Sequence, residues 1–482
     1  MQTNKKSFLK NIVGFSMMTW VSFLLAFIAS PIATRVFLPE ELGKINLFFT
    51  YSGLFVSFCY IGLDQAYVRF FKEPPLPLST KGLFSFCTYI AVGVAIFISV
   101  LFLLFKNPLS KEIMGEVEPT IIYCLGIYCI SLVVLRFISL SYRMQQNAVL
   151  YSIQGIVQAF LTKMAYVVVG LMQPNAYFSI ILLTICLALF TIACIAFQRK
   201  NFTFKLKKEI TPTVKRTIFY FALPLAPLAI FSYFTNSATQ LVLNQLMGKA
   251  AIGIYSAALG LASTVNIIQS GFNAYWAPYV LENYKNNQKT RFYSVHKIMA
   301  CLLCLFGLGL ALFQEVLYLI IGENFRSSML FFPFLLFSPI CYCLSETTCM
   351  GINISKKTYW TTIIFLITGI TNIVCCYLFI PTFGMVGAAF ASTITAILTL
   401  ILRSVIGLYY YRAIPSYIYI VYTVVLLLAS SFTNLFFDGI TKYSIIIGLL
   451  LIFFVLFRKE ILQLWQLLKE LLLQFLGKKK GN

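Results

Sequence analysis

The sequence is poor in charged residues, and poorest in acidic ones. Charged residues make up 11% of the 482 residues and apolar residues make up 60%, a balance that excludes a water-soluble globular chain. Only 15 residues are Asp or Glu and one is His, so the side chains that usually act as general acids, general bases and metal ligands are scarce. The composition therefore indicates a membrane protein and argues against an enzyme.

Basic residues are the more abundant charges, with 37 Lys and Arg and a net charge of +22. In a soluble protein this excess would suggest nucleic-acid binding, but here the basic residues form short clusters between long apolar runs. Most of the 13 cysteines lie inside apolar runs, where a thiol behaves as a small hydrophobic group. We therefore expect no nucleic-acid partner, no metal and no cofactor; whether an ion such as H⁺ or Na⁺ is coupled to function stays open.

Long apolar runs dominate the chain. A helix rises 1.5 Å per residue and must cross about 30 Å of hydrocarbon, so about 20 apolar residues make one span. Fourteen stretches qualify: 12–33, 45–63, 82–105, 120–140, 149–172, 177–197, 218–247, 252–274, 298–320, 329–350, 359–380, 385–408, 417–436 and 443–457. The sequence therefore predicts an all-α polytopic membrane protein with about 14 transmembrane helices.

The distribution of basic residues predicts the orientation, because cytoplasmic loops are enriched in Lys and Arg. If both termini are cytoplasmic, the inner segments hold 29 of the 37 basic residues. Adding or removing one span would invert half of this pattern, so the asymmetry also supports an even number of crossings.

A weak internal repeat divides the chain. The turn after the first span and the turn after the seventh align at an offset of 210 residues, which places Gly43 on Gly253. We predict an N-terminal six-helix lobe, a basic cytoplasmic linker, a C-terminal six-helix lobe, two additional helices and an amphipathic basic tail in the membrane interface. These parts cover residues 1–197, 198–216, 217–412, 413–457 and 458–482.

Seven segments carry a family resemblance: PIATRVFLPEELG, IGLDQAYVRFF, FALPLAPL, GKAAIGIYSAA, FNAYWAPYV, GINISKK and IPTFGMVGAAFAS. In this order they resemble the bacterial polysaccharide (O-antigen type) flippase family of the multidrug/oligosaccharidyl-lipid/polysaccharide exporter superfamily. The resemblance implies a multi-pass protein of the bacterial inner membrane that moves an undecaprenyl-pyrophosphate-linked oligosaccharide to the outer leaflet. It also implies a polysaccharide polymerase and sugar transferases as partners. One departure is that Thr239 and Gln240 stand where many relatives carry an Asp-Arg pair.

Polar side chains at helical spacing are the candidates for a sugar-binding cavity, because a lipid-facing polar group would be left unsatisfied. They follow one face on each of several predicted spans: Asn46, Gln158, Asn236, Gln240, Asn266, Gln269 and Asn273. The alternative is that these amides hydrogen-bond between packed helices, which stabilises membrane helices by roughly 1 kcal/mol or less per contact.

Three cations are candidates for binding the diphosphate. Lys163 lies well inside a predicted span, where its charge costs about 3 kcal/mol on insertion scales and so asks for a reason. Arg35 and Lys44 flank the first outer turn. The alternatives are that Lys163 snorkels to the interface and that Arg35 and Lys44 anchor the turn beside Glu40 and Glu41.

Asp64 and Arg69 lie five residues apart at the inner end of the second span. They are candidates for a gate or a contact between lobes; a local pair at the helix end is the alternative. Pro224 and Pro227 each remove a backbone hydrogen bond and predict a bend in the seventh span.

Three other functions remain as alternatives. A lipid II flippase would share the fold and the charge pattern. A multidrug exporter of the same superfamily would need buried Asp or Glu, of which the deep parts of the first eight spans have none. A membrane polysaccharide polymerase would need catalytic groups on a sizeable outer loop, whereas the longest predicted outer loop is 106–119.

Overall fold

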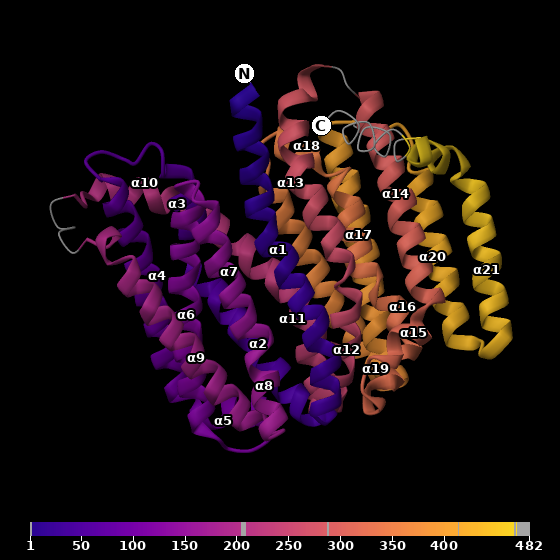
Figure 1. The fold of residues 1–482 in the computed structure, drawn as a ribbon, viewed down its shortest axis with the longest axis horizontal. Coiled ribbons are helices and arrows are strands. Elements are labelled where there is room, and N and C mark those ends of the chain that lie inside the picture. The colour runs from indigo at the N-terminus through magenta and orange to yellow at the C-terminus, as the bar shows by residue number, and fades with distance from the viewer. Residues whose placement is uncertain (1, 204–208, 287–288, 413, 467–468, 470–482) are drawn as a thin grey trace, which may run out of the picture. The chain divides into compact units, whose positions relative to one another are not determined.

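The computed structural model describes residues 2–203, 209–286, 289–412, 414–466 and 469, and it contains no strand in these ranges (Figure 1). The helices of the first half are α1 Gln2–Val36, α2 Pro39–Tyr60, α3 Leu63–Phe70, α4 Thr80–Leu104, α5 Lys106–Met114, α6 Pro119–Met144, α7 Ala148–Lys163, α8 Ala165–Met172, α9 Ala176–Phe197, η1 Arg199–Asn201, α10 Pro212–Ala222, η3 Leu223–Leu225 and α11 Ala226–Met247. The second half has α12 Lys249–Ala262, α13 Val265–Asn283, η4 Tyr284–Asn286, α14 Lys289–Leu312, α15 Gln314–Leu319, η5 Glu323–Leu330, α16 Phe332–Leu335, α17 Phe337–Glu346, α18 Met350–Ile354, α19 Tyr359–Tyr410, α20 Ile418–Phe436 and α21 Gly439–Leu456.

Short polar residues and prolines fix where several helices begin. The side chains of Ser79, Asn147 and Thr211 each accept a hydrogen bond from a backbone N–H of the first turn of α4, α7 and α10. Proline occupies the first turn of α2, α6 and α10, where its missing N–H costs nothing.

The structure confirms the predicted all-α membrane fold but not the count of fourteen spans. Among the described residues, eleven helices are long and apolar enough to cross a membrane, or up to thirteen if two bent helix pairs each form one span. The predicted spans 359–380 and 385–408 both fall within α19, which has 52 residues. Gly384 interrupts α19 with φ 59° and ψ −133°, a left-handed conformation that favours glycine.

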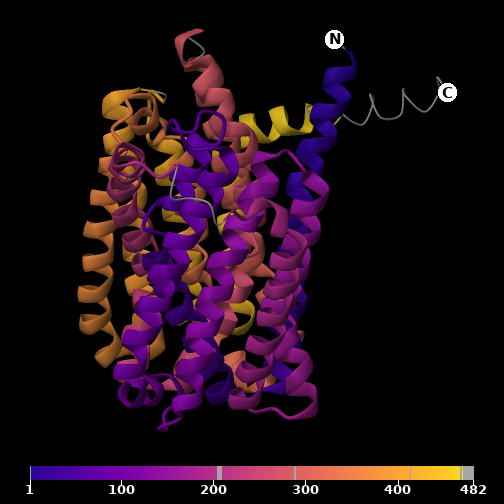
Figure 2. The same ribbon diagram turned by 90° about the vertical axis from the view of Figure 1, so that its left-hand side faces the viewer.

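The chain forms two compact units. The first comprises residues 1–261, 321–326 and 365–377, and the second comprises 262–320, 327–364 and 378–482. In the first unit α4 packs on α6, α1 on α7 and α2 on α11, and Figure 2 shows its long helices running side by side. In the second unit α14 packs on α20, α20 on α21 and α13 on α17. The division into two six-helix lobes with a linker stays a prediction.

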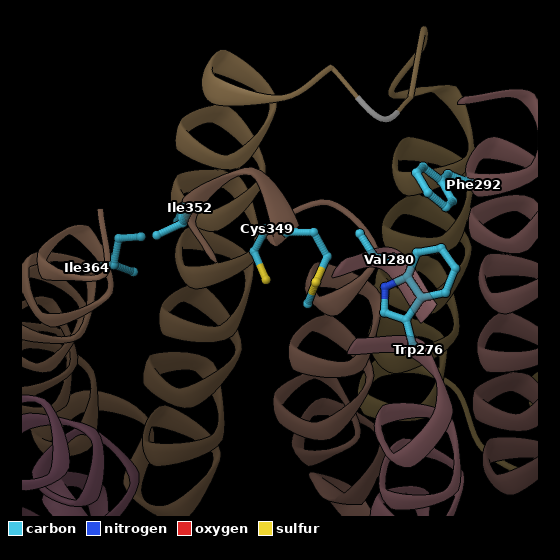
Figure 3. Close-up of a cluster of buried hydrophobic side chains, with 7 residues drawn as sticks. Trp276, Val280, Phe292, Cys349, Ile352 and Ile364 are labelled. Atoms are coloured by element: carbon cyan, nitrogen blue, oxygen red, sulfur yellow. The ribbon is translucent and has the colours of Figure 1, made fainter. Parts of the chain in front are cut away.

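A buried aromatic cluster organises one end of the second unit. Trp276 of α13 is 1% exposed and packs against Phe292 of α14 with ring centroids 5.7 Å apart (Figure 3). Its indole N–H donates to the carbonyl oxygen of Glu346 at 3.1 Å. This bond satisfies the polar end of a side chain that is otherwise fully packed, and it ties α13 to the end of α17.

Only the beginning of the predicted amphipathic tail belongs to the described residues. After a turn at Phe457, residues 458–466 are helical and turn away from the direction of α21 (Figure 1). Glu460 is 1% exposed, lies 3.5 Å from the ammonium of Lys297 and accepts a hydrogen bond from Tyr419. This buried carboxylate fixes the start of the tail to α14 and α20, whereas Lys478, Lys479 and Lys480 lie outside the described residues.

Polar contacts between distant segments agree with the predicted alternation of sides. Asp64 with Arg136, and Lys297 with Glu460, join residues predicted on the inner side. The contacts between residues predicted on the outer side are Asn244 with Glu112, Ala176 with Glu41, Gly322 with Thr34 and Lys442 with Glu315. Each pair lies within one unit, and an odd shift in the number of spans between its members would separate them.

Candidate functional site

Lys163 is the last residue of α7, at a break inside the predicted fifth span. The predicted span 149–172 is present as Ala148–Met172, in which the single residue Met164 separates α7 from α8. The Lys163 side chain is exposed, and none of the described carboxylates pairs with it. Lys163 thus lies inside a span that continues to Met172, as the sequence predicts.

The surroundings of Lys163 leave both of its predicted roles open. The exposed face of α7 next to it is apolar, with Val149 65%, Ile153 54% and Phe160 44% exposed. Snorkelling along such a face remains an alternative to a contact with substrate.

Arg35 lies at the end of α1 and lines a cavity of about 390 Å³ in the first unit. Arg326 lines the same cavity, although it is almost 300 residues away in the sequence. The backbone N–H of Gly322 donates to Thr34 Oγ1 at 3.0 Å, which holds the 321–326 segment against the end of α1. Two guanidinium groups with one neighbouring carboxylate, Glu323, give this cavity a positive balance.

Lys44 is engaged by its own helix. Its ammonium lies 2.6 Å from Glu41 and 3.5 Å from Glu40. Glu41 also accepts a hydrogen bond at 2.6 Å from the backbone N–H of Ala176, at the start of α9. This network favours the anchoring alternative for Lys44 over a role in phosphate binding.

The predicted amides of the first unit divide into bound and accessible ones. Gln240 of α11 accepts from Thr50 of α2 at 2.6 Å and donates to Ser256 of α12 at 3.4 Å, so it joins three helices. Asn236 is exposed and Asn46 is half-buried, and each donates to a carbonyl of its own helix. Gln158 is half-buried on α7. Gln240 thus fits the packing alternative, while the others keep polar atoms available to a ligand.

Asn266, Gln269 and Asn273 all lie on α13 in the second unit and are half-buried. The buried oxygen of the Asn273 side chain has no hydrogen-bond partner among the described residues. Whether these amides and those of the first unit serve one cavity stays a prediction.

Asp64 does not pair with Arg69, so the alternative of a local pair at the helix end is wrong. Asp64 is buried and accepts from Arg136 of α6 at 3.1 Å and from Gln65 at 2.9 Å. Arg69 instead lies over the ring of Phe70, 5.7 Å from its centroid. The reason is geometric, since residues five apart on a helix point in different directions. A gate role for Asp64 or Arg69 stays a prediction.

A buried ion pair in the second unit was missed in the sequence. Arg403 of α19 lies 2.8 Å from Glu346 at the end of α17, and it also donates to Ser345 Oγ at 2.6 Å. Its guanidinium lies over the Tyr342 ring, 4.4 Å from the centroid. The signal was present, because both charges interrupt apolar runs near their predicted inner ends.

The residues described here contain no group of three or more His, Cys, Asp or Glu side chains arranged to hold a metal ion. The thirteen cysteines are free thiols, and none of them is exposed.

Solved structures share this fold. This chain is similar to the structure titled "Lipid II flippase MurJ, inward closed conformation", with a TM-score of 0.65 and 14% identity. The match covers 92% of this chain and 97% of that chain. It is similar to the MATE multidrug transporter DinF-BH over 85% of this chain and 96% of that one, with a TM-score of 0.57 and 14% identity. This chain is also similar to an inward-facing multidrug resistance MATE family transporter of the MOP superfamily, with a TM-score of 0.56 and 14% identity. That match covers 82% of this chain and 98% of that chain.

Sequence comparison gives the family. No curated protein matches this chain. The family model described as "Polysaccharide biosynthesis protein" matches residues 8–280, which is more than half of the chain. The resemblance expected from the seven sequence segments is thereby confirmed: this multi-pass membrane chain belongs to the polysaccharide biosynthesis protein family and has the fold of MOP-superfamily transporters.

Proposed function

We propose that the protein is a flippase that moves an undecaprenyl-pyrophosphate-linked oligosaccharide from the inner to the outer leaflet of a bacterial cytoplasmic membrane. The family supports a role in polysaccharide biosynthesis, and the shared fold supports transport. Movement would proceed by alternating access, with the sugars and diphosphate passing through the protein while the polyprenyl chain stays in lipid. Both termini would be cytoplasmic, and sugar transferases and a polymerase would supply and consume the cargo.

The observation that carries this proposal is the pairing of buried acids. Three carboxylates are buried in the described part of the chain, and each lies beside a cation: Asp64 beside Arg136, Glu346 beside Arg403 and Glu460 beside Lys297. A transporter of cationic drugs needs a buried carboxylate free to exchange its counter-ion. The described residues offer no buried carboxylate of that kind, so the charge pattern favours an anionic cargo.

The second support for an anionic cargo is a set of accessible cations that could bind it. Lys163 is exposed at a break within a span, and Arg35 and Arg326 line one cavity at the predicted outer side. In the proposal Lys163 contacts the diphosphate during passage, and Arg35 contacts it near release. Asn46, Gln158, Asn236, Asn266, Gln269 and Asn273 are the proposed sugar contacts, whereas Gln240 and Lys44 act mainly in packing.

The test is transport by the purified full-length protein in vesicles that contain a fluorescent lipid-linked oligosaccharide. Loss of one charge-assisted hydrogen bond costs about 1.5–3 kcal/mol, so Lys163→Ala should slow flipping by roughly tenfold or more. Lys163→Arg should retain most activity because the positive charge remains. Lys111→Ala, which removes an exposed cation of α5, is the matched control and should leave transport unchanged.

Transport of wild-type rate by Lys163→Ala would remove Lys163 from the substrate path and leave it as a snorkelling residue. The cargo is tested in the same vesicles. Movement of a lipid II-type headgroup but not of longer oligosaccharides would support the lipid II alternative, and uptake of cationic dyes alone would contradict an anionic cargo.

A further inference from the structure

The first unit contains a second cavity, of about 690 Å³, between the short helices α3 and α10. It is lined by one cation and otherwise by aromatic, aliphatic and hydroxyl side chains: Arg216, Phe70, Thr217, Tyr220, Phe221, Pro224 and Leu225. None of the residues proposed for transport lies in this lining. The cavity is therefore a separate candidate site.

Close packing of α3 and α10 fixes the shape of this cavity. Gly62 has φ +72° and precedes α3, and a Cβ added there would lie 2.2 Å from the carbonyl oxygen of Ala222, at the end of α10. The rings of Phe70 and Phe221 meet edge to face, with centroids 5.6 Å apart. Arg69, which does not line the cavity, lies over the Phe70 ring at 5.7 Å from its centroid. The two aromatic rings in the lining, Phe70 and Phe221, thus come from two helices that pack against each other.

Helix length places the cavity at the depth of lipid headgroups. The helical segment Pro212–Met247 has 36 residues, and the 22 residues of α11 alone measure about 33 Å, enough to cross the roughly 30 Å of hydrocarbon. Pro224 lies within η3 Leu223–Leu225, a 3₁₀ segment that separates α10 from the spanning part α11. The cavity lies beside η3, because Pro224 and Leu225 belong to its lining. Tyr220 also lines it, and tyrosine is enriched at the interface between membrane and water.

Its charge is positive. Arg216 is exposed, and none of the described carboxylates lies within ion-pair distance of it. Arg69, Lys72 and Lys215 are exposed close by in sequence, with Glu73 as the nearby acid. Each basic residue near an anionic membrane surface contributes about 1 kcal/mol of attraction. Tyr220 is 83% exposed and Leu223 is 52% exposed, which is unfavourable in water but suits contact with acyl chains.

We propose that this cavity binds an anionic glycerophospholipid from the adjacent leaflet, with its phosphate on Arg216 and an acyl chain over Phe70, Tyr220 and Phe221. A single guanidinium in the lining matches a single phosphate charge better than a diphosphate. The inference does not rest on the proposed transport function, because the bound lipid is a resident of the membrane rather than the cargo.

Native mass spectrometry of the full-length protein with phosphatidylglycerol, and with phosphatidylcholine as the neutral comparator, tests this site. Arg216→Gln should weaken phosphatidylglycerol binding about tenfold, and Tyr220→Ser should weaken it severalfold. Lys215→Gln is the matched control, since it removes the same charge one residue away but does not line the cavity. Tyr409→Ser controls for loss of an exposed tyrosine, because Tyr409 is 82% exposed in the other unit. All four side chains are exposed, so the variants should fold, and equal thermal unfolding would verify this.

Three results would overturn the proposal. Equal losses in Arg216→Gln and Lys215→Gln would mean diffuse attraction to the basic segment. Displacement of the lipid by inorganic phosphate alone would mean a simple anion site. Preference for a polyprenyl diphosphate over phosphatidylglycerol in competition would assign the cavity to the carrier lipid. Selective loss in Arg216→Gln and Tyr220→Ser, resistant to free phosphate, would support it.

Discussion

Gly43 and Gly253 pack against the beginning of each other's helix. A Cβ on Gly43 would lie 1.9 Å from the carbonyl oxygen of Lys249, the first residue of α12, and a Cβ on Gly253 would lie 1.9 Å from that of Pro39, the first residue of α2. Both glycine positions and both helix starts differ by 210 residues, the offset of the sequence repeat. The weak repeat thus corresponds to a reciprocal contact within the first unit, as a local two-fold relationship requires.

Replacing either glycine with alanine should destabilise the protein by about 1–3 kcal/mol or more, because backbone and not a flexible side chain blocks the new methyl group. The double variant Gly43→Ala/Gly253→Ala should cost less than the sum, since separating α2 from α12 relieves both overlaps. Thermal unfolding with a thiol-reactive dye measures this, because none of the cysteines is exposed in the folded protein.

Gly93→Ala is the matched control for this pair. Gly93 is an exposed helical glycine of α4, and nothing lies within 4 Å of an added Cβ. It should unfold at the same temperature or slightly higher, because alanine restricts the unfolded chain. Additive losses for Gly43 and Gly253 would show that the two contacts are independent.

The sequence predicted those features that hydrocarbon and water impose directly. Apolar runs of about 20 residues predicted the membrane helices, and the prolines at 224 and 227 mark the place where the 3₁₀ segment Leu223–Leu225 interrupts the α-helix. The alternation of basic loops placed Asp64 and Arg136 on one side of the membrane, and the two residues are in contact. Each of these follows from local composition, so no knowledge of the packing partners is needed.

Pairings between helices could not be predicted in the same way. Gln240 has the same spacing whether it faces a cavity or, as observed, joins Thr50 and Ser256. Asp64 likewise lies near Arg69 in the sequence, but it pairs with Arg136 on another helix. Which face of a membrane helix meets a neighbour is decided by the fit of several helices at once, and a single sequence does not carry that information.

Asp64 and Arg136 should respond unequally to substitution. The Asp64 side chain is 10% exposed and that of Arg136 is 42% exposed. Arg136→Gln leaves a buried carboxylate with the amide of Gln65 but without its counter-charge, and it should cost more than Asp64→Asn, which leaves a guanidinium that is less buried. We expect Arg136→Gln to lower the free energy of unfolding by about 2–3 kcal/mol and Asp64→Asn to lower it by about 1 kcal/mol, measured by thermal unfolding.

Arg69→Gln tests whether Asp64 also depends on Arg69, its neighbour on α3. Arg69 is exposed and stacks on Phe70, so its loss should change stability by less than about 0.5 kcal/mol. If Arg69→Gln were as harmful as Arg136→Gln, the carboxylate of Asp64 would have to depend on both cations.

Gln154 and Gln158 lie one turn apart on α7 and should behave differently. Gln154 is buried and donates to the carbonyl oxygen of Leu135 on α6 at 2.9 Å, whereas Gln158 is half-buried. Gln154→Leu should lower stability by about 0.6–1.7 kcal/mol, the range for hydrogen bonds between membrane helices. Gln158→Leu should leave stability unchanged and slow vesicle transport severalfold. A loss of transport that follows stability in both variants would argue against Gln158 as a sugar contact.

Removing one charge of the Glu346–Arg403 pair should destabilise the protein more than replacing both residues with apolar ones. Both side chains are buried, and Arg403 is held by Glu346, Ser345 and the ring of Tyr342. Glu346→Gln leaves a buried guanidinium without its counter-charge and should destabilise the protein by about 3–5 kcal/mol. Glu346→Leu/Arg403→Met removes both charges and should recover most of this loss, because apolar side chains of similar volume need no desolvation.

Glu323→Gln is the control for this last experiment. It removes the acid from the pair with Arg326, whose side chains are 85% and 45% exposed, and an exposed pair contributes about 1 kcal/mol or less. If the apolar double variant stayed as unstable as Glu346→Gln but still flipped lipid at the wild-type rate, the pair would be needed for packing alone. If it regained stability and lost transport, the two charges would act in the transport cycle, for example by holding α17 against α19 in only one of its states.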